Sequence, residues 1–254
     1  MTDRTLFSIK EITVLYIITV VLFLLSSIFL IDRLGIIGIP VTHIISILSP
    51  GLFLTIYLRK DIRKVYMFYS VKKMKYFFIG ILLWIAAVIV SGIYSYYAMR
   101  ILPSEELIES FDYIFSETTF TQQVVIMAVI PAVVEEMFFR GIMFNSLKKK
   151  TGVKVAAVVS SLLFASMHFS LIKIFPTFLL GVVFTYVVYK TGSILPAVVL
   201  HFINNFMSVA VQHLMPNAEL DNLGYTALNY KIILLFTVIY VLYNSRGNYE
   251  KTKV

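Results

Sequence analysis

Two adjacent glutamates, Glu135 and Glu136, lie in an apolar stretch that is long enough to cross a bilayer, and Arg140 follows four residues later. A charged side chain at the bilayer centre costs roughly 2.5–3.5 kcal/mol even on the more lenient insertion scales. Two further apolar stretches carry His168 and His201. A membrane protein that keeps these groups in its apolar region is expected to perform chemistry or to move ions there.

Helical spacing separates the two glutamates. Glu136 and Arg140 are i,i+4 neighbours with the acid first, which is the better orientation for an ion pair. In a buried site, the loss of either member would leave an uncompensated charge. Glu135 points about 100° around the helix and has no basic partner one turn on, because residue 139 is Phe. Glu135 is therefore the candidate base, and Glu136 is the expected structural partner of Arg140.

Pro131 lies one turn before Glu135. Proline has no N–H and its ring clashes with the carbonyl four residues earlier, that of Met127, so we expect a kink that exposes backbone polar groups beside the acid. Irregular backbone at membrane depth is tolerated where it lines a water-filled cavity. The sequence therefore predicts water near Glu135.

The histidines fall into two groups. His168 follows Phe164 by one turn, so that the two rings can pack together, and His201 shares a helix face with Asn205, next to Asn204. His43 and His213 lie outside this pattern, and we interpret them as hydrogen-bonded core residues. At 1.5 Å rise per residue, Glu135, His168 and His201 lie roughly 12–21 Å from the same membrane boundary, which allows one shared site.

The composition sets the fold class. The chain has 254 residues, of which 59% are hydrophobic and only 14% charged; soluble domains are nearer 25% charged. The mean hydropathy of +0.87 agrees. We expect an all-α, polytopic membrane protein that forms a single domain over residues 1–254, with the catalytic site inside the helical bundle. No cysteine occurs, which excludes disulfides, a thiol nucleophile and thiolate metal ligands.

About 20 apolar residues cross the hydrocarbon core. The apolar stretches on this template support seven or eight spans, and we prefer eight. They cover about residues 12–31, 34–58, 76–98, 120–146, 154–174, 176–190, 193–214 and 229–244. The first is interpreted as a retained helix, because no cleavage site for a signal peptide follows it.

The charge pattern favours eight spans. Most basic residues fall in the termini and the even-numbered loops, above all in residues 59–75 and 148–154, whereas most acids fall in the opposite loops, near residues 105–117 and 219–221. The positive-inside rule then places both termini in the cytoplasm. The net charge of +8 indicates contact with anionic lipid and needs no nucleic-acid partner. Residues 59–75 form either an interfacial amphipathic segment or an ordinary basic loop.

Three chemistries could use these side chains. In acid–base hydrolysis, a carboxylate and a histidine activate water while His and Asn donate hydrogen bonds to an oxyanion. Alternatively, Glu135, His168 and His201 could bind a divalent metal, although the H-E-x-x-H pattern common in such zinc sites does not occur. The third is a proton or ion relay in a transporter, against which stands the lack of an inverted repeat.

The residues resemble a known family. The series Glu135-Glu136-x-x-x-Arg140, Phe164-x-x-x-His168 and His201-x-x-x-Asn205 is similar to the motifs of the CAAX-protease and bacteriocin-processing (CPBP, or Abi) family, and the resemblance covers about residues 120–210. It implies a glutamate-dependent intramembrane endopeptidase with eight helices. Glu135 and His168 would activate the water, and His201 and Asn205 would form the oxyanion hole. Glu136, Arg140 and Phe164 would support them.

The resemblance leaves the substrate class open among prenylated proteins, peptide pheromones and bacteriocins, and a non-catalytic immunity or scaffold protein remains an alternative. We expect a membrane-embedded or lipidated peptide or protein as the partner, in a bacterial or archaeal cell membrane. We expect no cofactor and no metal, because Asn205 is a poor zinc ligand and a good amide donor. If His201 donates to the oxyanion, only Glu135 and His168 remain to hold a metal, and a catalytic zinc typically needs three protein ligands.

Overall fold

The computed structural model describes residues 6–102 and 116–214. These residues form helices joined by short turns, and no strand occurs among them. Of the elements, η1 is a 3-10 helix and η2, η3 and η4 are π-helical. In chain order they are α1 (Ile9–Leu34), η1 (Gly35–Ile37), α2 (Gly38–His43), η2 (Ile44–Leu48), α3 (Ser49–Tyr57), α4 (Ile62–Val65), α5 (Lys75–Ile101), α7 (Phe120–Gln123), η3 (Val124–Val129), α8 (Ile130–Glu136), η4 (Met137–Phe144), α9 (Asn145–Thr151), α10 (Val153–Ser166), α11 (Leu171–Thr191) and α12 (Leu195–Leu214).

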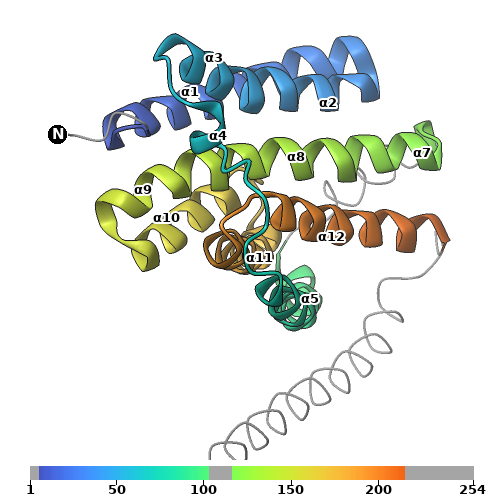
Figure 1. Ribbon diagram of the computed structural model, residues 1–254. Coiled ribbons are helices and arrows are strands. Elements are labelled where there is room, and N and C mark those ends of the chain that lie inside the picture. Colours follow the sequence, from blue (N-terminus) through green and yellow to red (C-terminus); the bar gives the residue numbers. More distant parts are fainter. Residues whose placement is uncertain (1–5, 103–115, 215–254) are drawn as a thin grey trace, which may run out of the picture.

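The first two predicted spans form a helical hairpin. Ser8 and Glu11 close a capping box at the start of α1, which satisfies two of its free backbone N–H groups. After η1 the chain turns back, and α2, η2 and α3 run along α1 (Figure 1). Gly38 allows this turn, because a Cβ there would lie 2.5 Å from the carbonyl oxygen of Leu30. We call residues 9–57 the N-terminal hairpin.

The central helix runs without interruption from α7 to α9, that is, over residues 120–151. Figure 1 shows it between the N-terminal hairpin on one side and α12 on the other. The same view looks along α5 and α11, which pack against each other and cross the direction of α8 and α12. The glutamates thus lie on a helix that is flanked by the N-terminal hairpin and α12.

Four helical stretches of the described residues are long and apolar enough to cross a membrane. They are Ile9–Tyr57, which folds back as the N-terminal hairpin, Lys75–Ile101, Leu171–Thr191 and Leu195–His213. The predicted span over residues 120–146 is helical but carries the charged cluster. The predicted eighth span, residues 229–244, and most of the acids near residues 105–117 and 219–221 lie outside the described residues. The count of eight spans therefore stays a prediction.

The boundary between the fifth and sixth spans was predicted wrongly. The sequence analysis extended the fifth span to residue 174 and began the sixth at Pro176, whereas α10 ends at Ser166 and α11 begins at Leu171. Ser170 caps α11 by accepting a hydrogen bond from the N–H of Lys173, and Phe169 has a positive φ of 46°. Pro176 lies inside α11 instead of before it. His168 consequently lies in a turn and not within a spanning helix.

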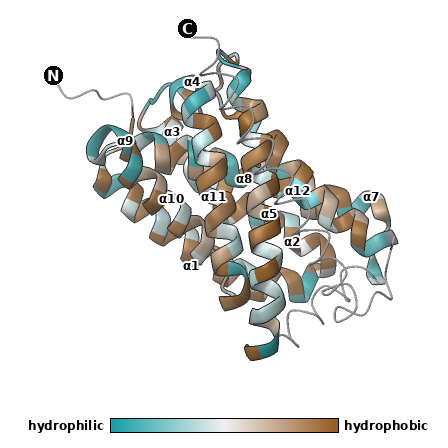
Figure 2. Ribbon diagram, turned by 90° about the horizontal axis from the view of Figure 1, so that it is seen from below, coloured by the Kyte–Doolittle hydropathy of each residue, from teal (hydrophilic) through white to brown (hydrophobic). Residues whose placement is uncertain are grey.

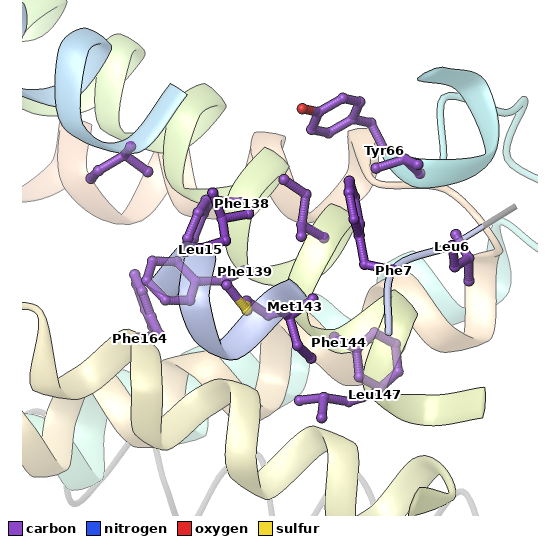
Figure 3. Close-up of a cluster of buried hydrophobic side chains, with 14 of the residues drawn as sticks. Leu6, Phe7, Leu15, Tyr66, Phe138, Phe139, Met143, Phe144, Leu147 and Phe164 are labelled. Atoms are coloured by element: carbon purple, nitrogen blue, oxygen red, sulfur yellow. The ribbon is translucent and has the colours of Figure 1, made fainter. Parts of the chain in front are cut away.

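Two hydrophobic clusters hold these elements together. The larger one joins the N-terminal hairpin and the segment after it to η4 and α10 (Figure 3). Within it, the ring of Phe139 contacts those of Phe138 and Phe164. The smaller one joins α5, α11 and α12 around Phe184 and Leu200. Arg140 lies near the boundary of the two clusters, with its guanidinium over the rings of Phe164 and Phe184 at 4.4 and 5.4 Å.

Two basic segments lie together at one end of the molecule, around α4 and α9. Figure 2 shows hydrophilic residues around α4 and α9, and mostly hydrophobic residues along the long helices. The Asn145 side-chain amide joins the two basic segments, because it donates to the carbonyls of Lys64 and Val65. Tyr66 and Met67 are buried. The middle of the segment 59–75 therefore packs into the protein, whereas most of its other residues are exposed. The only helix in it before α5 begins is the four-residue α4.

Candidate active site

The predicted pair of Glu136 and Arg140 is present and is fully buried. The guanidinium donates to Glu136 Oε1 at 2.7 Å, and the two side chains are 0% and 1% exposed. The same guanidinium also donates to the carbonyl of Gly181 in α11 at 3.2 Å. Arg140 thereby links the central helix to α11, and its positive charge is paired with the buried Glu136 carboxylate.

His201 completes this buried group from α12. Its Nδ1 lies 2.9 Å from Glu136 Oε1, the oxygen that also accepts from Arg140. The imidazole stacks on Phe184 with 5.2 Å between ring centroids and meets the edge of Phe164 at 5.9 Å. Since a carboxylate can only accept a hydrogen bond, Nδ1 carries hydrogen. Glu136 therefore fixes which nitrogen of His201 faces Glu135.

Glu135 lies between two histidines. Its Oε2 is 3.8 Å from His201 Nε2, and its Oε1 is 3.5 Å from His43 Nε2. The Glu135 side chain is 10% exposed, whereas Glu136 is 0% exposed. Glu135 also interacts electrostatically with His168 and Arg140. Of the two carboxylates, Glu135 is thus the one that faces other ionisable groups without a close arginine partner.

His43, interpreted from the sequence as a hydrogen-bonded core residue, is hydrogen-bonded to the Ile39 carbonyl but also contacts the candidate base. His43 is the last residue of α2 and reaches the candidate base from the N-terminal hairpin. From the sequence it was set aside because it lies outside the pattern of the motif residues. The contact joins residues 43 and 135 and depends on how the hairpin packs on the central helix. Its one sequence signal was a histidine in an irregular apolar stretch between Pro40 and Pro50.

His168 reaches the site from the turn after α10. Its Nδ1 lies 3.2 Å from the Phe164 carbonyl, and its ring meets the edge of Phe164 at 5.3 Å. The predicted packing of these two rings is confirmed. Because the carbonyl accepts, Nδ1 carries hydrogen, and a neutral His168 then presents the lone pair of Nε2. That tautomer suits a proton acceptor.

Asn205 lies beside the backbone that Pro131 disturbs. An α-helix would pair the Met127 carbonyl with the N–H of residue 131, which proline lacks. Asn205 Nδ2 donates to this carbonyl at 3.0 Å instead. The π-helical η3 ends two residues before Pro131, so the expected irregular backbone is present.

A chain of hydrogen bonds holds Asn205 in place. Trp84 of α5 donates from Nε1 to Asn204 Oδ1 at 3.1 Å, and Asn204 Nδ2 donates to Asn205 Oδ1 at 3.1 Å. Asn204, which was singled out from the sequence only as the neighbour of Asn205, is its hydrogen-bond partner. Two helices that are far apart in sequence, α5 and α12, thereby position the Asn205 amide next to η3. The sequence analysis gave no role to Trp84, since no motif contains it.

The structure brings most of the predicted residues together. Glu135, Glu136, Arg140 and His201 are linked by direct contacts, His168 faces them across Phe164, and Asn205 lies one turn beyond His201. His213 stays apart, with its ring against Phe120 at 4.8 Å. Among the described residues, no group of three or more His, Asp or Glu side chains has an arrangement that could hold a metal ion.

Comparison with known protein families gives a match for part of the chain. Residues 117–207 match the family of type II CAAX prenyl endopeptidase Rce1-like proteins. This part of the chain is therefore similar to that family. The resemblance inferred from the motifs is thereby confirmed, and it implies a protease of the CAAX prenyl endopeptidase type. No curated protein and no solved structure matched the chain.

The Rce1-like segment does not contain every residue of the site. It runs from the residues before α7 into α12 and includes both glutamates, Arg140, His168, His201 and Asn205. His43 and Trp84 lie outside it, in the N-terminal hairpin and α5. The family match therefore accounts for the motif residues, while two of their neighbours come from the rest of the chain.

Proposed function

We propose that the protein is an intramembrane endopeptidase that hydrolyses a peptide bond of a membrane-associated or lipid-modified peptide or protein. The main support for this proposal is that the two adjacent carboxylates have different partners and different exposure. Glu136 is held by Arg140 and His201, whereas Glu135 faces His43 and His201 and is partly accessible. A structural ion pair would need only one acid. The second acid, Glu135, is then available as a base beside His168 and His201.

In the proposed reaction, Glu135 and His168 activate a water molecule. The water gives one proton to the Glu135 carboxylate as its oxygen adds to the scissile carbonyl carbon, and His168 Nε2 accepts a hydrogen bond from the second O–H. The carbonyl oxygen becomes an oxyanion. When the C–N bond breaks, the protonated Glu135 returns its proton to the leaving amine. The products are a new carboxyl group and a new amino group.

His201 and Asn205 are the proposed donors to the oxyanion. An amide nitrogen has two hydrogens, so that the bond from Asn205 to Met127 uses only one. His201 is more constrained, since Nδ1–H already points at Glu136. Nε2 donates only when the ring is an imidazolium. Such an imidazolium would lie 2.9 Å from Glu136 and 3.8 Å from Glu135, and these carboxylates offset its charge in the buried site.

The proposed substrate lies in or on the bilayer, in keeping with apolar helices and basic segments at one end of the described chain. The proposed location is a bacterial or archaeal cell membrane with both termini in the cytoplasm, and no nucleic acid takes part. Prenylated proteins, peptide pheromones and bacteriocins all remain within this substrate class.

The test compares cleavage with transport. The purified protein is placed in liposomes without any ion gradient, together with a library of membrane-tethered peptides, and products are identified by mass spectrometry. We expect a peptide bond to be cleaved. In parallel, gradient-driven uptake of ions and peptides is measured in the same liposomes. Uptake that depends on Glu135, with no cleavage across the library, would contradict the proposal and favour a transporter.

A further inference from the structure

The contact of His43 with the candidate base comes from outside the segment that matches the protease family. His43 lies in α2, at the junction with the π-helical η2, and its Nε2 is 3.5 Å from Glu135 Oε1. Its side chain is 16% exposed. π-helical turns are rare and often occur at functional sites. Here the wide turn starts directly after the histidine.

The ring of His43 is held from three sides. Nδ1 lies 3.1 Å from the carbonyl of Ile39 one turn earlier, and Phe23 of α1 meets the ring edge-on at 5.8 Å. Phe23 in turn stacks on Phe169 at 6.1 Å, in the turn that carries His168. The third side is Glu135. The N-terminal hairpin therefore contacts both proposed water-activating residues, directly at Glu135 and through Phe23 beside His168.

The two neighbours of His43 determine where its hydrogens lie. The Ile39 carbonyl can only accept, so Nδ1 carries a hydrogen. If Nε2 had a lone pair and Glu135 were ionised, two lone pairs would face each other. A proton must therefore lie between Nε2 and Oε1. In the imidazolium form it lies on His43, and Glu135 is then the carboxylate that a general base requires.

We propose that His43 is a positioning residue that holds Glu135 as an oriented carboxylate by donating to it from a protonated imidazole. This rests on the proposed function of Glu135. His43 keeps its proton throughout the cycle, and the proton from water goes to Glu135 and then to the leaving amine. The N-terminal hairpin thus forms part of the active site and is more than a membrane anchor.

The kinetic test uses substitutions of matched shape. In His43→Phe the ring and its packing on Phe23 are kept, but the charge and the donor are lost. We expect kcat to fall by roughly 10²-fold, the lower end of what a positioned proton-transfer group contributes, with KM changed less than threefold. His43→Gln can still donate from its amide and should keep more activity than His43→Phe. His213→Phe is the control, because that ring lies away from the site against Phe120, and it should be as active as the wild type.

A spectroscopic test does not depend on any substrate. The chain has four histidines, which ¹⁵N-labelling resolves by their protonation state in purified protein at neutral pH. We expect an imidazolium signal that disappears in His43→Phe, persists in His213→Phe, and changes to a neutral imidazole in Glu135→Gln. A neutral His43 in the wild type would overturn the proposal, as would a His43→Phe variant with wild-type kcat. Lack of cleavage by the wild type would contradict the proposed function alone, since the labelling result would still decide the state of His43.

Discussion

The two glutamates differ in what they contact, although they are adjacent in sequence. Glu136 accepts from Arg140 and His201 through one oxygen, and its Oε2 has no hydrogen-bond partner among the described residues. Glu135 is slightly exposed and contacts two histidines at 3.5 and 3.8 Å. Spacing along one helix predicted this division, because only residue 136 has a basic residue one turn later.

Removing one member of the buried pair should destabilise the protein. In Glu136→Gln or Arg140→Ala, the remaining charge loses its partner, and the free energy of unfolding should fall by about 3–5 kcal/mol. Thermal melting in detergent measures this, with Glu117→Gln, an exposed acid, as the unchanged control. Glu135→Gln should melt close to the wild type. If instead Glu135→Gln unfolds the protein and Glu136→Gln leaves it folded but inactive, the two roles are reversed.

Asn205 should matter for turnover and also for local order. Asn205→Ala removes a proposed oxyanion donor, and turnover should fall by roughly 10²–10³-fold with substrate binding little changed. It also leaves the Met127 carbonyl and the Asn204 amide without their partner. Trp84 is the single tryptophan, so its fluorescence should shift when this chain of hydrogen bonds breaks.

A suitable control is Ser208→Ala, one turn further along α12, where the hydroxyl donates to a backbone carbonyl. It should change neither turnover nor Trp84 fluorescence. Unchanged kcat in Asn205→Ala would remove Asn205 from the oxyanion hole. If the fluorescence changes while kcat does not, the role of Asn205 is limited to its hydrogen bond with the Met127 carbonyl.

At the scale of elements, the hairpin and the helix boundaries show what sequence patterns can and cannot predict. The hairpin, α5, the central helix and α12 follow from long apolar stretches and their interruptions. The break between α10 and α11 was misplaced because Pro176 was given more weight than the capping serine, Ser170. The π-helical turns were not predicted, since they depend on side chains of neighbouring helices. His43 was missed for the same reason.

The turn of the N-terminal hairpin offers a test at this scale. A Cβ on Gly38 would lie 2.5 Å from the Leu30 carbonyl oxygen, and backbone cannot move aside as a flexible side chain can. Gly38→Ala should therefore lower the free energy of unfolding by about 1–3 kcal/mol, as overpacking typically does. It should also lower activity if the hairpin positions His43. The adjacent Ile37 is 65% exposed, and Ile37→Ala should have little effect on either.

The result that would contradict this account is a Gly38→Ala variant with normal stability and normal activity. Normal stability with reduced activity would still agree with a hairpin that adjusts its position. The two measurements are thermal melting in detergent and cleavage of the tethered peptide.

At the scale of the whole molecule, the charged residues fall into two groups, one buried in the central helix and one at an end of the molecule. The apolar N-terminal hairpin and α12 flank a central helix that carries the buried charges (Figure 1), while the lysines around α4 and α9 lie at one end. Composition predicted an all-helical membrane protein, and motif order predicted the family. The orientation in the membrane and the total of eight spans stay predictions, because they depend partly on residues 215–254.

The expected chemistry needs no metal ion. We predict that the purified protein contains no stoichiometric metal by elemental analysis, and that cleavage survives incubation with chelators. Water activation is assigned to Glu135 and His168, and His201 Nδ1 is already bonded to Glu136. Stoichiometric zinc, with activity lost on chelation and restored by adding the metal back, would overturn this mechanism while leaving the protease function intact.

The central claim is that this protein hydrolyses peptide bonds and that Glu135 is the base. The most direct measurement is the rate at which purified protein in liposomes cleaves a membrane-tethered peptide, for the wild type, Glu135→Gln and Glu117→Gln. We predict cleavage by the wild type and by Glu117→Gln, and none by Glu135→Gln, which should nevertheless melt at nearly the wild-type temperature. Cleavage by Glu135→Gln at the wild-type rate would contradict the account.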